Sequence, residues 1–298
     1  MDRLHNQILL LFSIPIYAVI IPLEILISNF GGLKYYSLKE TLVNIYLNAL
    51  NTGLDILLRF LIGLNLLNFF YQYHVSIQWN VFAYWAVLLL GEDLLFWLEH
   101  YVDHHCRLFW AVHVTHHSSA EYNLTTGFRS SVFMPVYNYL YFIPLVLLGF
   151  RPLDVVFMFS VTQIYGTLVH TQAVLKLPHW IEYIFVTPSH HRVHHACNIP
   201  YLDRNMGMVF IIWDRLFNTF TAESPEEKPH YGIRAPIGNP YHPVNIVTHE
   251  WKNIGKDLIK ETSLKNKWNY LFKPPGWSHD GPDLRARTLR KQLKAQNK

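Results

Sequence analysis

Apolar residues in the first half of the chain gather in long, nearly uninterrupted runs. Residues 8–27 ("ILLLFSIPIYAVIIPLEILI") form the first of them, and about 20 residues is the length that an α-helix needs to cross a bilayer. The run is too long for the core of a cleaved signal peptide, and no clear small-residue cleavage site follows it. We therefore predict that these residues form a retained membrane span.

Two more apolar runs precede residue 100. Residues 50–71 are interrupted by Asp55 and Arg59, so a helix lying in the plane of the membrane interface is an alternative to a span there. Residues 79–98 are apolar except for two adjacent carboxylates, and their length again fits a span.

A pair of apolar runs, residues 132–150 and 153–169, is separated only by Arg151 and Pro152. So short a connection predicts a helical hairpin. Prolines inside the first run are tolerable because neighbouring helices can satisfy the freed carbonyl groups. The pattern as a whole predicts an all-α integral membrane bundle of four or five spans.

The composition changes after about residue 170. Residues 196–298 carry much of the charge, contain no long apolar run and end in "RARTLRKQLKAQNK". We expect this region in water or on the membrane surface, with its basic end facing anionic lipid headgroups. The net charge of +4 is too small and too scattered to indicate nucleic-acid binding, and two distant cysteines, Cys106 and Cys197, do not indicate a disulfide framework.

Histidines are the most informative residues of the chain. Positions i, i+3 and i+4 share one face of a helix, so histidines at these spacings can direct their rings to one point. Clustered imidazoles repel one another when protonated, whereas a metal ion uses their lone pairs. Nine histidines have ligand spacing or, in one case, stand alone at the end of an apolar run: His100, His104, His113, His116, His117, His170, His191, His194 and His195.

The predicted path of the chain brings these histidines to one membrane face. The span at 79–98 delivers the first groups, the hairpin at 132–169 returns His170 to the same face, and the triplet at 191–195 follows without another crossing. Most Lys and Arg lie on that side, so the positive-inside rule makes it cytoplasmic. The N-terminus would then lie outside if all five spans exist.

The remaining histidines have no ligand spacing, and ordinary hydrogen-bonding or interfacial roles are expected for them. Three lie close to the spaced groups but out of their rhythm: His105, His179 and His190. The others are His5, His74, His230, His242, His249 and His279.

The number of spaced histidines predicts two metal ions, because nine imidazoles exceed what one tetrahedral zinc ion accepts. Spacing alone does not distinguish zinc, copper, iron and nickel. The predicted location does, because a site at the ends of membrane helices suits a substrate whose tail lies in lipid. Oxidation of unreactive C–H bonds in such a tail needs redox chemistry that zinc cannot supply, and this favours iron.

Nearby polar side chains could orient the histidine rings by accepting their free N–H groups. Asp93 is the strongest candidate, because it precedes His100 by two helical turns within an apolar run where a charge is costly; pairing with a polar group of another span is the alternative. Loop or capping roles suit the further candidates equally well: Asn123, Arg129, Asp203, Asn205 and Asp214. Trp110 and Trp213 are expected to be interfacial or core aromatics.

The order of these motifs is distinctive. H-x-x-x-H, H-x-x-H-H followed by Ser, a lone histidine after a helix, and "TPSHHRVHH" leading to "NMG" and "IIWDRLFNTF" together resemble the fatty acid hydroxylase and sterol desaturase superfamily of integral membrane di-iron enzymes. The resemblance covers roughly residues 79–223. The stretches "HHSSAEYNLTT", "PSHHRVHHACN" and "IIWDRLFNTFTAE", with "YGI" and "PPGW" further on, look most like the alkylglycerol monooxygenase branch.

The resemblance implies that the nine spaced histidines hold two irons, which use O2 to place one oxygen atom in a substrate C–H bond and release the other as water. It also implies an external electron donor, either a reduced pterin or a partner of the cytochrome b5 or ferredoxin type. One departure is Val174, because some members carry a second histidine four residues after the position of His170. His105 and His190 stand beside presumed ligands, but the i, i+4 spacing favours His104 and His191.

These observations predict a membrane monooxygenase with N-terminal membrane helices at 1–78, a catalytic domain at 79–223 and a cytoplasmic C-terminal region at 224–298, the histidine-bearing helices forming a cytoplasmic cap. We expect hydroxylation of an ether lipid, a fatty acyl chain or a sterol, in a bacterial inner membrane or the endoplasmic reticulum, with desaturation as the alternative. A metal transporter would place histidines along a path through several spans, and a zinc hydrolase would carry a motif such as H-E-x-x-H, which the sequence lacks.

Overall fold

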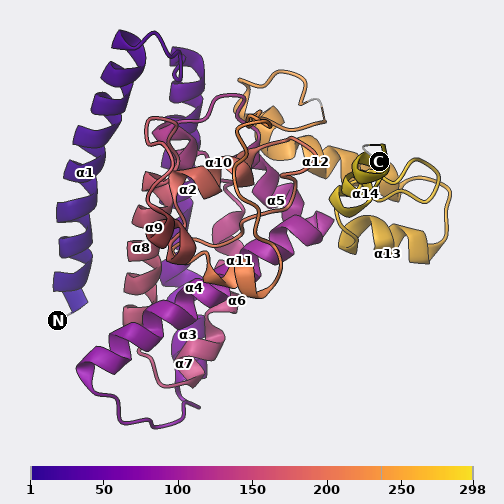
Figure 1. Cartoon of the computed structure of the whole chain (residues 1–298). Helices are drawn as coiled ribbons and strands as arrows, with labels where there is room; N and C mark the ends of the chain where they lie inside the picture. Colours follow the sequence, from indigo (N-terminus) through magenta and orange to yellow (C-terminus); the bar gives the residue numbers. More distant parts are fainter. Residues whose placement is uncertain (1, 236, 297–298) are drawn as a thin grey trace.

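The computed structural model describes residues 2–235 and 237–296, with side chains from residue 15 onward. Regular structure in this part of the chain is helical apart from isolated β-bridges, which confirms the all-α prediction. Long helices near the N-terminus stand beside α8, whereas the C-terminal helices project to the other side (Figure 1). The side chain of His5, expected to have no metal role, lies outside the described residues.

The long apolar helices come first in the chain. They are α1 (Asp2–Phe30), α2 (Leu38–Leu58), the π-helical turn η1 (Arg59–Gly63), α3 (Leu64–Tyr71) and α4 (Val81–His105). α2, η1 and α3 are continuous and form a 34-residue helix, which begins well before the predicted run at 50–71. By length and composition this helix and α4 could each cross a membrane. The predicted span at 8–27 lies within α1.

The two charges within the apolar run at 50–71 pair with each other. Asp55 and Arg59 form an ion pair one turn apart, and the Tyr139 hydroxyl donates to Asp55 (2.9 Å) while accepting from Arg59 Nε (3.0 Å). Gly63 allows this tyrosine to come close, because a Cβ atom at Gly63 would lie 2.7 Å from the ring. The charges are therefore paired inside the bundle and do not oppose a membrane position.

The predicted helical hairpin is wrong in its first half. Residues 132–150 form three short pieces in place of one span: η3 (Met134–Val136), α6 (Asn138–Tyr141) and α7 (Ile143–Leu147). Pro135 and Pro144 lie in the first turns of η3 and α7, where a missing N–H is tolerated but a preceding helix cannot continue. The second half of the hairpin, α8 (Pro152–Leu168), is a regular helix. The structure thus does not confirm four or five spans.

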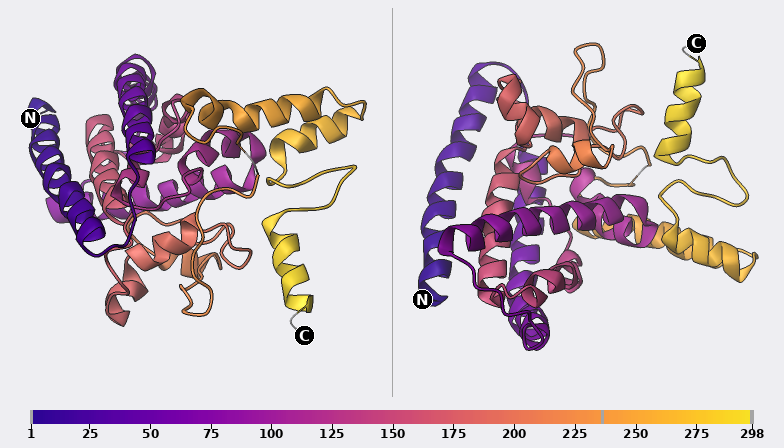
Figure 2. Two further views of the ribbon diagram at one scale, coloured as in Figure 1. Left: turned by 90° about the horizontal axis from the view of Figure 1, so that it is seen from above. Right: turned by 60° about the horizontal axis from the view of Figure 1, so that its bottom comes forward.

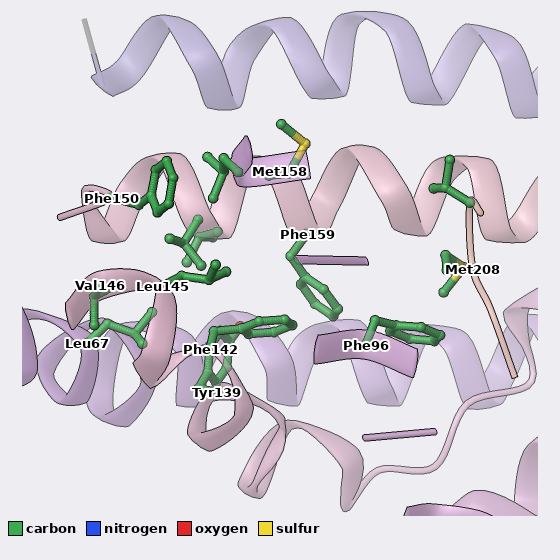
Figure 3. Close-up of a cluster of buried hydrophobic side chains, with 14 residues drawn as sticks. Leu67, Phe96, Tyr139, Phe142, Leu145, Val146, Phe150, Met158, Phe159 and Met208 are labelled. Atoms are coloured by element: carbon green, nitrogen blue, oxygen red, sulfur yellow. The ribbon is translucent and has the colours of Figure 1, made fainter. Parts of the chain in front are cut away.

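The main hydrophobic core lies between α8 and the helices α3, α4, α6 and α7. Phe142 and Phe159 meet there with ring centroids 5.2 Å apart, and Phe96 and Met208 lie at one end of the cluster (Figure 3). Phe96 and Met208 also line a cavity beside the histidines. Core packing therefore fixes one wall of that cavity.

The remaining helices carry or support the histidines. They are α5 (Arg107–His117), η2 (Leu124–Phe128), α9 (His179–Ile184), α10 (Pro188–His195), α11 (Ile212–Leu216), α12 (Pro243–Leu258), α13 (Leu264–Phe272) and α14 (Ala286–Gln296). α12 and α13 extend away from the bundle (Figure 2). Arg107 holds α12 against α5, since its guanidinium donates to Glu250 and to Asp257, both at 2.7 Å.

Candidate metal centre

Three helices and one loop position supply the spaced histidines. α4 ends at His105 and α5 begins at Arg107, with Cys106 extended between them, so the histidines at the end of α4 and those on α5 come from adjoining helices. His170 follows the end of α8. In α10, Thr187 caps the first turn, and Pro188, which lacks the N–H that a first turn leaves unbonded, begins the helix.

The structure brings the nine spaced histidines together in two adjacent groups. Within each group, one ring nitrogen per residue lies within 4.8 Å of the others. The five-histidine group consists of His100, His104, His113, His117 and His194. The four-histidine group consists of His116, His170, His191 and His195. Histidines on neighbouring turns of α5 and of α10 thus belong to different groups.

The Nε2 atoms within the groups face one another. In the five-histidine group, His113 Nε2 lies 3.0 Å from His100 Nε2 and 3.1 Å from His117 Nε2. In the four-histidine group, His170 Nε2 lies between 2.9 and 3.2 Å from the Nε2 atoms of three neighbours: His116, His191 and His195. One N–H cannot satisfy three facing nitrogens, so most of these contacts set lone pair against lone pair.

The outward Nδ1 atoms have hydrogen-bond acceptors that fix the tautomer. In the five-histidine group, the loop at residues 203–206 provides three of them: the Asp203 carboxylate for His104 (3.2 Å), the Arg204 carbonyl for His194 (2.9 Å) and the Met206 carbonyl for His100 (2.8 Å). In the four-histidine group, backbone carbonyls accept from His116 and His170. Because Nδ1 carries the proton, Nε2 directs a lone pair inward, as a metal ligand requires.

Burial keeps these rings neutral. Burial and the neighbouring imidazoles lower the pKa of His194 and His195 well below the ordinary 6.5, and burial lowers the pKa of His116 to about 4. The Nε2 atoms of His104 and His194 have no hydrogen-bond partner among the described side chains. Neutral rings with converging, unsatisfied lone pairs fit two bound cations, and the histidine groups are consistent with a di-metal site.

Two of the predicted supporting residues shape the loop at 203–206. Asp203 accepts from His104, as described above, and Asn205 holds the loop in place by donating to the carbonyls of His190 (3.0 Å) and Thr221 (2.8 Å). Both residues have positive φ, 51° and 57°, which Asp and Asn tolerate better than most residues. Asp214 accepts from the N–H groups of Met206 and Gly207, each at 2.8 Å, and holds the end of the same loop.

The structure corrects the role expected for Asp93. Its carboxylate does not accept from a histidine but from the N–H groups of Val209 (2.8 Å) and Phe210 (3.0 Å) and from Trp213 Nε1 (2.9 Å). The spacing from His100 suggested a shared helical face, but three residues that follow the loop at 203–206 donate to the carboxylate instead. Asp93 therefore positions the chain behind the loop, and Trp213 is its partner.

Asn123 and Arg129 support the site through the backbone. Asn123 caps η2 and donates to the Tyr35 carbonyl (2.6 Å), which is the capping role left open from the sequence. The Arg129 carbonyl accepts from His116 Nδ1 (3.2 Å), while its buried guanidinium donates to Glu40 (2.8 Å) and Asn44 (3.0 Å) of α2. Arg129 thus connects the four-histidine group to the long apolar helix.

One supporting carboxylate was missed by the sequence analysis. Asp103 Oδ2 lies 3.5 Å from His113 Nδ1, and its other oxygen accepts from the Tyr137 hydroxyl (2.9 Å). Its position, one residue before His104 and one turn after Glu99, was the available signal. Trp110 lies against the five-histidine group, with its ring 5.1 Å from that of His104.

Among residues with described side chains, the histidines predicted to lack a metal role stay outside both groups. His105 stacks on Tyr101 at 3.9 Å and bonds its carbonyl. His190 accepts from the Thr187 N–H at the start of α10 (3.3 Å). His179 begins α9 and is exposed.

A cavity opens beside both histidine groups. Three members of the four-histidine group line it, together with two of the five-histidine group: His116, His170, His191, His100 and His113. The facing wall is mainly apolar or small, with Phe96, Val112, Met134, Met208 and three glycines. At about 60 Å³, the cavity has room for only a short apolar segment beside the histidines.

Known proteins share these features in sequence. Residues 85–219 match the fatty acid hydroxylase family. Human alkylglycerol monooxygenase is 36% identical over 210 residues, 70% of this chain and 46% of that protein. Ornithine lipid hydroxylase of Rhizobium tropici is 32% identical over 166 residues, 54% of this chain and 48% of that protein. Delta(7)-sterol 5(6)-desaturase of Gibberella zeae is 29% identical over 163 residues, 52% of this chain and 48% of that protein.

The chain spans about half the length of these curated relatives. No solved structure matches it significantly. Nine imidazoles divided between two adjacent points, in a helical protein with two apolar helices of membrane-spanning length, are consistent with the class of membrane proteins that carry a di-metal site. Within that class, the chain belongs to the fatty acid hydroxylase superfamily, which confirms the resemblance drawn from the histidine motifs. These relatives are named as a monooxygenase, a hydroxylase and a desaturase, which agrees with the prediction that the protein is an oxidoreductase.

Proposed function

We propose that this protein is a membrane-bound di-iron oxygenase that hydroxylates a C–H bond of a lipid. One observation carries the proposal: the two histidine groups share a single, mainly apolar cavity. When bound there, two irons would supply the oxidation of a C–H bond by O2. An ether lipid is favoured among the substrate classes, because similarity to alkylglycerol monooxygenase extends over 70% of the chain.

The chain's own residues perform three tasks in this proposal. The nine spaced histidines hold the ions, and their Nδ1 acceptors keep the inward nitrogens unprotonated. Phe96 and Met208 exclude water from the cavity. Val112 lines both this cavity and a second, almost wholly apolar groove with Leu108, Phe133 and Trp251, a surface suited to an alkyl chain.

The remaining parts of the proposal concern the surroundings of the enzyme. Electrons come from an external donor, a reduced pterin or a protein of the cytochrome b5 or ferredoxin type. The two apolar helices and the family indicate an integral membrane protein, and we assign the histidine groups to its cytoplasmic face, where the positive-inside rule puts most Lys and Arg. Residues 79–223 form the catalytic part.

The decisive experiment combines metal analysis with isotope labelling. Purified protein should contain two irons per chain, and turnover of an alkylglycerol under labelled O2 should leave the label in the lipid product, as mass spectrometry detects. Two irons with an unlabelled, unsaturated product would instead identify a desaturase, the reaction named for the sterol relative. Protein that binds no iron, or that moves metal across vesicle membranes without oxidising lipid, would refute the oxygenase.

A further inference from the structure

An amide group whose hydrogen-bonding capacity is unused lines the cavity beside the histidines. Gln163 lines it together with His116, His170 and His191. Its amide Nε2 is buried and has no hydrogen-bond partner within residues 15–235 and 237–296. A buried amide N–H left without an acceptor destabilises the folded protein, so a partner for this group is expected from outside the chain.

Other polar side chains of α8 form hydrogen bonds within the protein. The Thr162 hydroxyl bonds Glu92 (3.1 Å) and the Phe159 carbonyl (2.9 Å), and the Thr167 hydroxyl donates to the Gln163 carbonyl (3.0 Å). The free amide of Gln163 is therefore not a general property of this helix. It occurs on the face that lines the cavity.

Helix geometry aligns Gln163 with the metal centre. Gln163, Gly166, Thr167 and His170 occupy positions i, i+3, i+4 and i+7, and all four line the cavity. Gly166 permits close packing there, because a Cβ atom at this position would lie 2.0 Å from Met208 Sδ. Gln163 lies two turns before His170, about 10 Å along the helix axis. A group bound to its amide would thus lie several bonds from a carbon held beside the four-histidine group.

The rest of the cavity wall is mixed, with the hydroxyl groups of Ser130, Ser131 and Thr167 as well as apolar side chains. Phe96, Val112, Met134 and Met208 are apolar, and they face the same space. An unpartnered amide donor beside these apolar side chains suits a chain that is apolar except for one acceptor. It does not suit a bare hydrocarbon, which would leave the amide unsatisfied.

We propose that Gln163 donates a hydrogen bond to an oxygen atom of the lipid in this cavity, and thereby selects lipids with an ether, ester or hydroxyl oxygen over a plain alkyl chain. The inference rests on the proposed function for the identity of the ligand as a lipid. Gln163 is then a specificity-determining residue, and the histidines remain the residues that act on the reacting carbon.

The test compares equilibrium binding of three probes to iron-loaded protein in lipid nanodiscs: a 1-O-alkylglycerol, the diol in which a methylene group replaces the ether oxygen, and the alkane of equal length. Gln163→Met keeps the side-chain volume but removes the donor. We expect it to bind the alkylglycerol roughly tenfold more weakly, with alkane binding unchanged. An equal loss with the diol assigns the bond to a hydroxyl, and an unchanged diol assigns it to the ether oxygen.

The matched control is Ser160→Ala, one turn earlier on α8, whose hydroxyl bonds only the Val156 carbonyl of its own helix. It should bind all three probes as the unmodified protein does. The inference is overturned if Gln163→Met binds the alkylglycerol normally, or if it loses alkane affinity to the same degree. Gln163→Asn, which retains the amide, should recover part of the loss if Gln163→Met folds poorly.

Binding requires neither turnover nor an electron donor, so the two proposals fail separately. Normal probe selectivity without any hydroxylated product would count against the proposed function alone. Hydroxylation with no dependence on Gln163 would count against the inference alone. Iron content and the thermal unfolding midpoint of each variant establish that the cavity is intact.

Discussion

The five-histidine and four-histidine groups lie side by side, yet the protein supports them differently. Three rings of the five-histidine group bond the loop at 203–206, and a fourth faces Asp103. The four-histidine group relies on the carbonyls of Gly166 and Arg129, and His191 Nδ1 has no partner among the described residues. The second group has fewer ligands and fewer fixed rings.

The cavity shows the same asymmetry. It is lined by three of the four members of one group but by two of the five members of the other. An ion with four protein ligands keeps more room for a further ligand than one with five. From this comparison we expect the five-histidine group to hold an ion more firmly, and the four-histidine group to expose one to the cavity.

The largest expected effect on the difference between the two groups comes from replacing the central histidine of the four-histidine group. His170→Ala deletes the nitrogen that contacts three other Nε2 atoms at 2.9–3.2 Å. We expect loss of about one metal per chain and a fall in lipid oxidation of more than about 100-fold, measured by elemental analysis and product formation. The five-histidine group should keep its ion.

His105→Ala is the matched control, because His105 lies beside a ligand but bonds only the Tyr101 carbonyl. It should keep both ions and most activity. If the His105 variant lost metal as His170→Ala does, the division into ligand and neighbour would be incorrect.

A smaller effect is expected from the loop that supports the five-histidine group. Asp203→Ala removes the carboxylate that accepts from His104 Nδ1, and loss of such an acceptor weakens metal binding by roughly 10- to 100-fold. Chelator competition should show one ion released early, while the ion of the four-histidine group is unchanged. Asp203→Asn should recover part of the affinity, because an amide oxygen still accepts.

Asp280→Ala provides the control for Asp203→Ala, since Asp280 is a half-exposed carboxylate that bonds Ser278 and Tyr270. Early release of both ions from Asp203→Ala would show that the two groups are not supported independently.

Most of the site could be predicted from the sequence, because the spacing of histidines within a single helix depends only on neighbouring residues. Helical spacing alone selects His113, His116 and His117, and the same rule applied at 191–195. What spacing could not show is that His116 separates from His113 and His117 into another group. That division depends on how α5 packs against α10 and the end of α8, a property of tertiary structure.

The fold was less predictable where proline decides the local conformation. The apolar run at 132–150 satisfied a length criterion, but Pro135 and Pro144 begin new helical turns there. The role of Asp93 was also beyond sequence reasoning. Its partners lie more than 110 positions later in the chain, and no periodicity links them.

Acidification sharpens the comparison further. Burial lowers the pKa of His116 to about 4, and burial and the neighbouring imidazoles lower the pKa of His195 well below its ordinary value. The unfolded state, with histidine pKa near 6.5, therefore binds more protons than the folded state below that pH. Stability of metal-free protein is therefore complete above about pH 6.5 and is lost as the pH falls toward 4, by up to about 1.4 kcal/mol per histidine per pH unit.

The consequence for bound metal is a two-step release. His116 is only partly buried, and its group has one ligand fewer, so protons should displace the ion of the four-histidine group first. Dialysis at a series of pH values from 8 to 5, followed by elemental analysis, should show one ion lost before the other. Simultaneous loss of both ions, or an unfolding midpoint of metal-free protein that does not change with pH, would contradict this account.

The smallest expected effect separates two adjacent residues of "TPSHHRVHH". His190 accepts from the Thr187 N–H (3.3 Å) and closes the first turn of α10, whereas His191 Nε2 lies 2.9 Å from His170 Nε2. His190→Gln should cost about 1 kcal/mol of stability through the weakened cap and leave both ions in place, as thermal unfolding and metal content would show. Loss of an ion from this variant would show that His190, and not His191, is the ligand. The ligand would then point about 100° further around α10, and the membership of the four-histidine group would be incorrect.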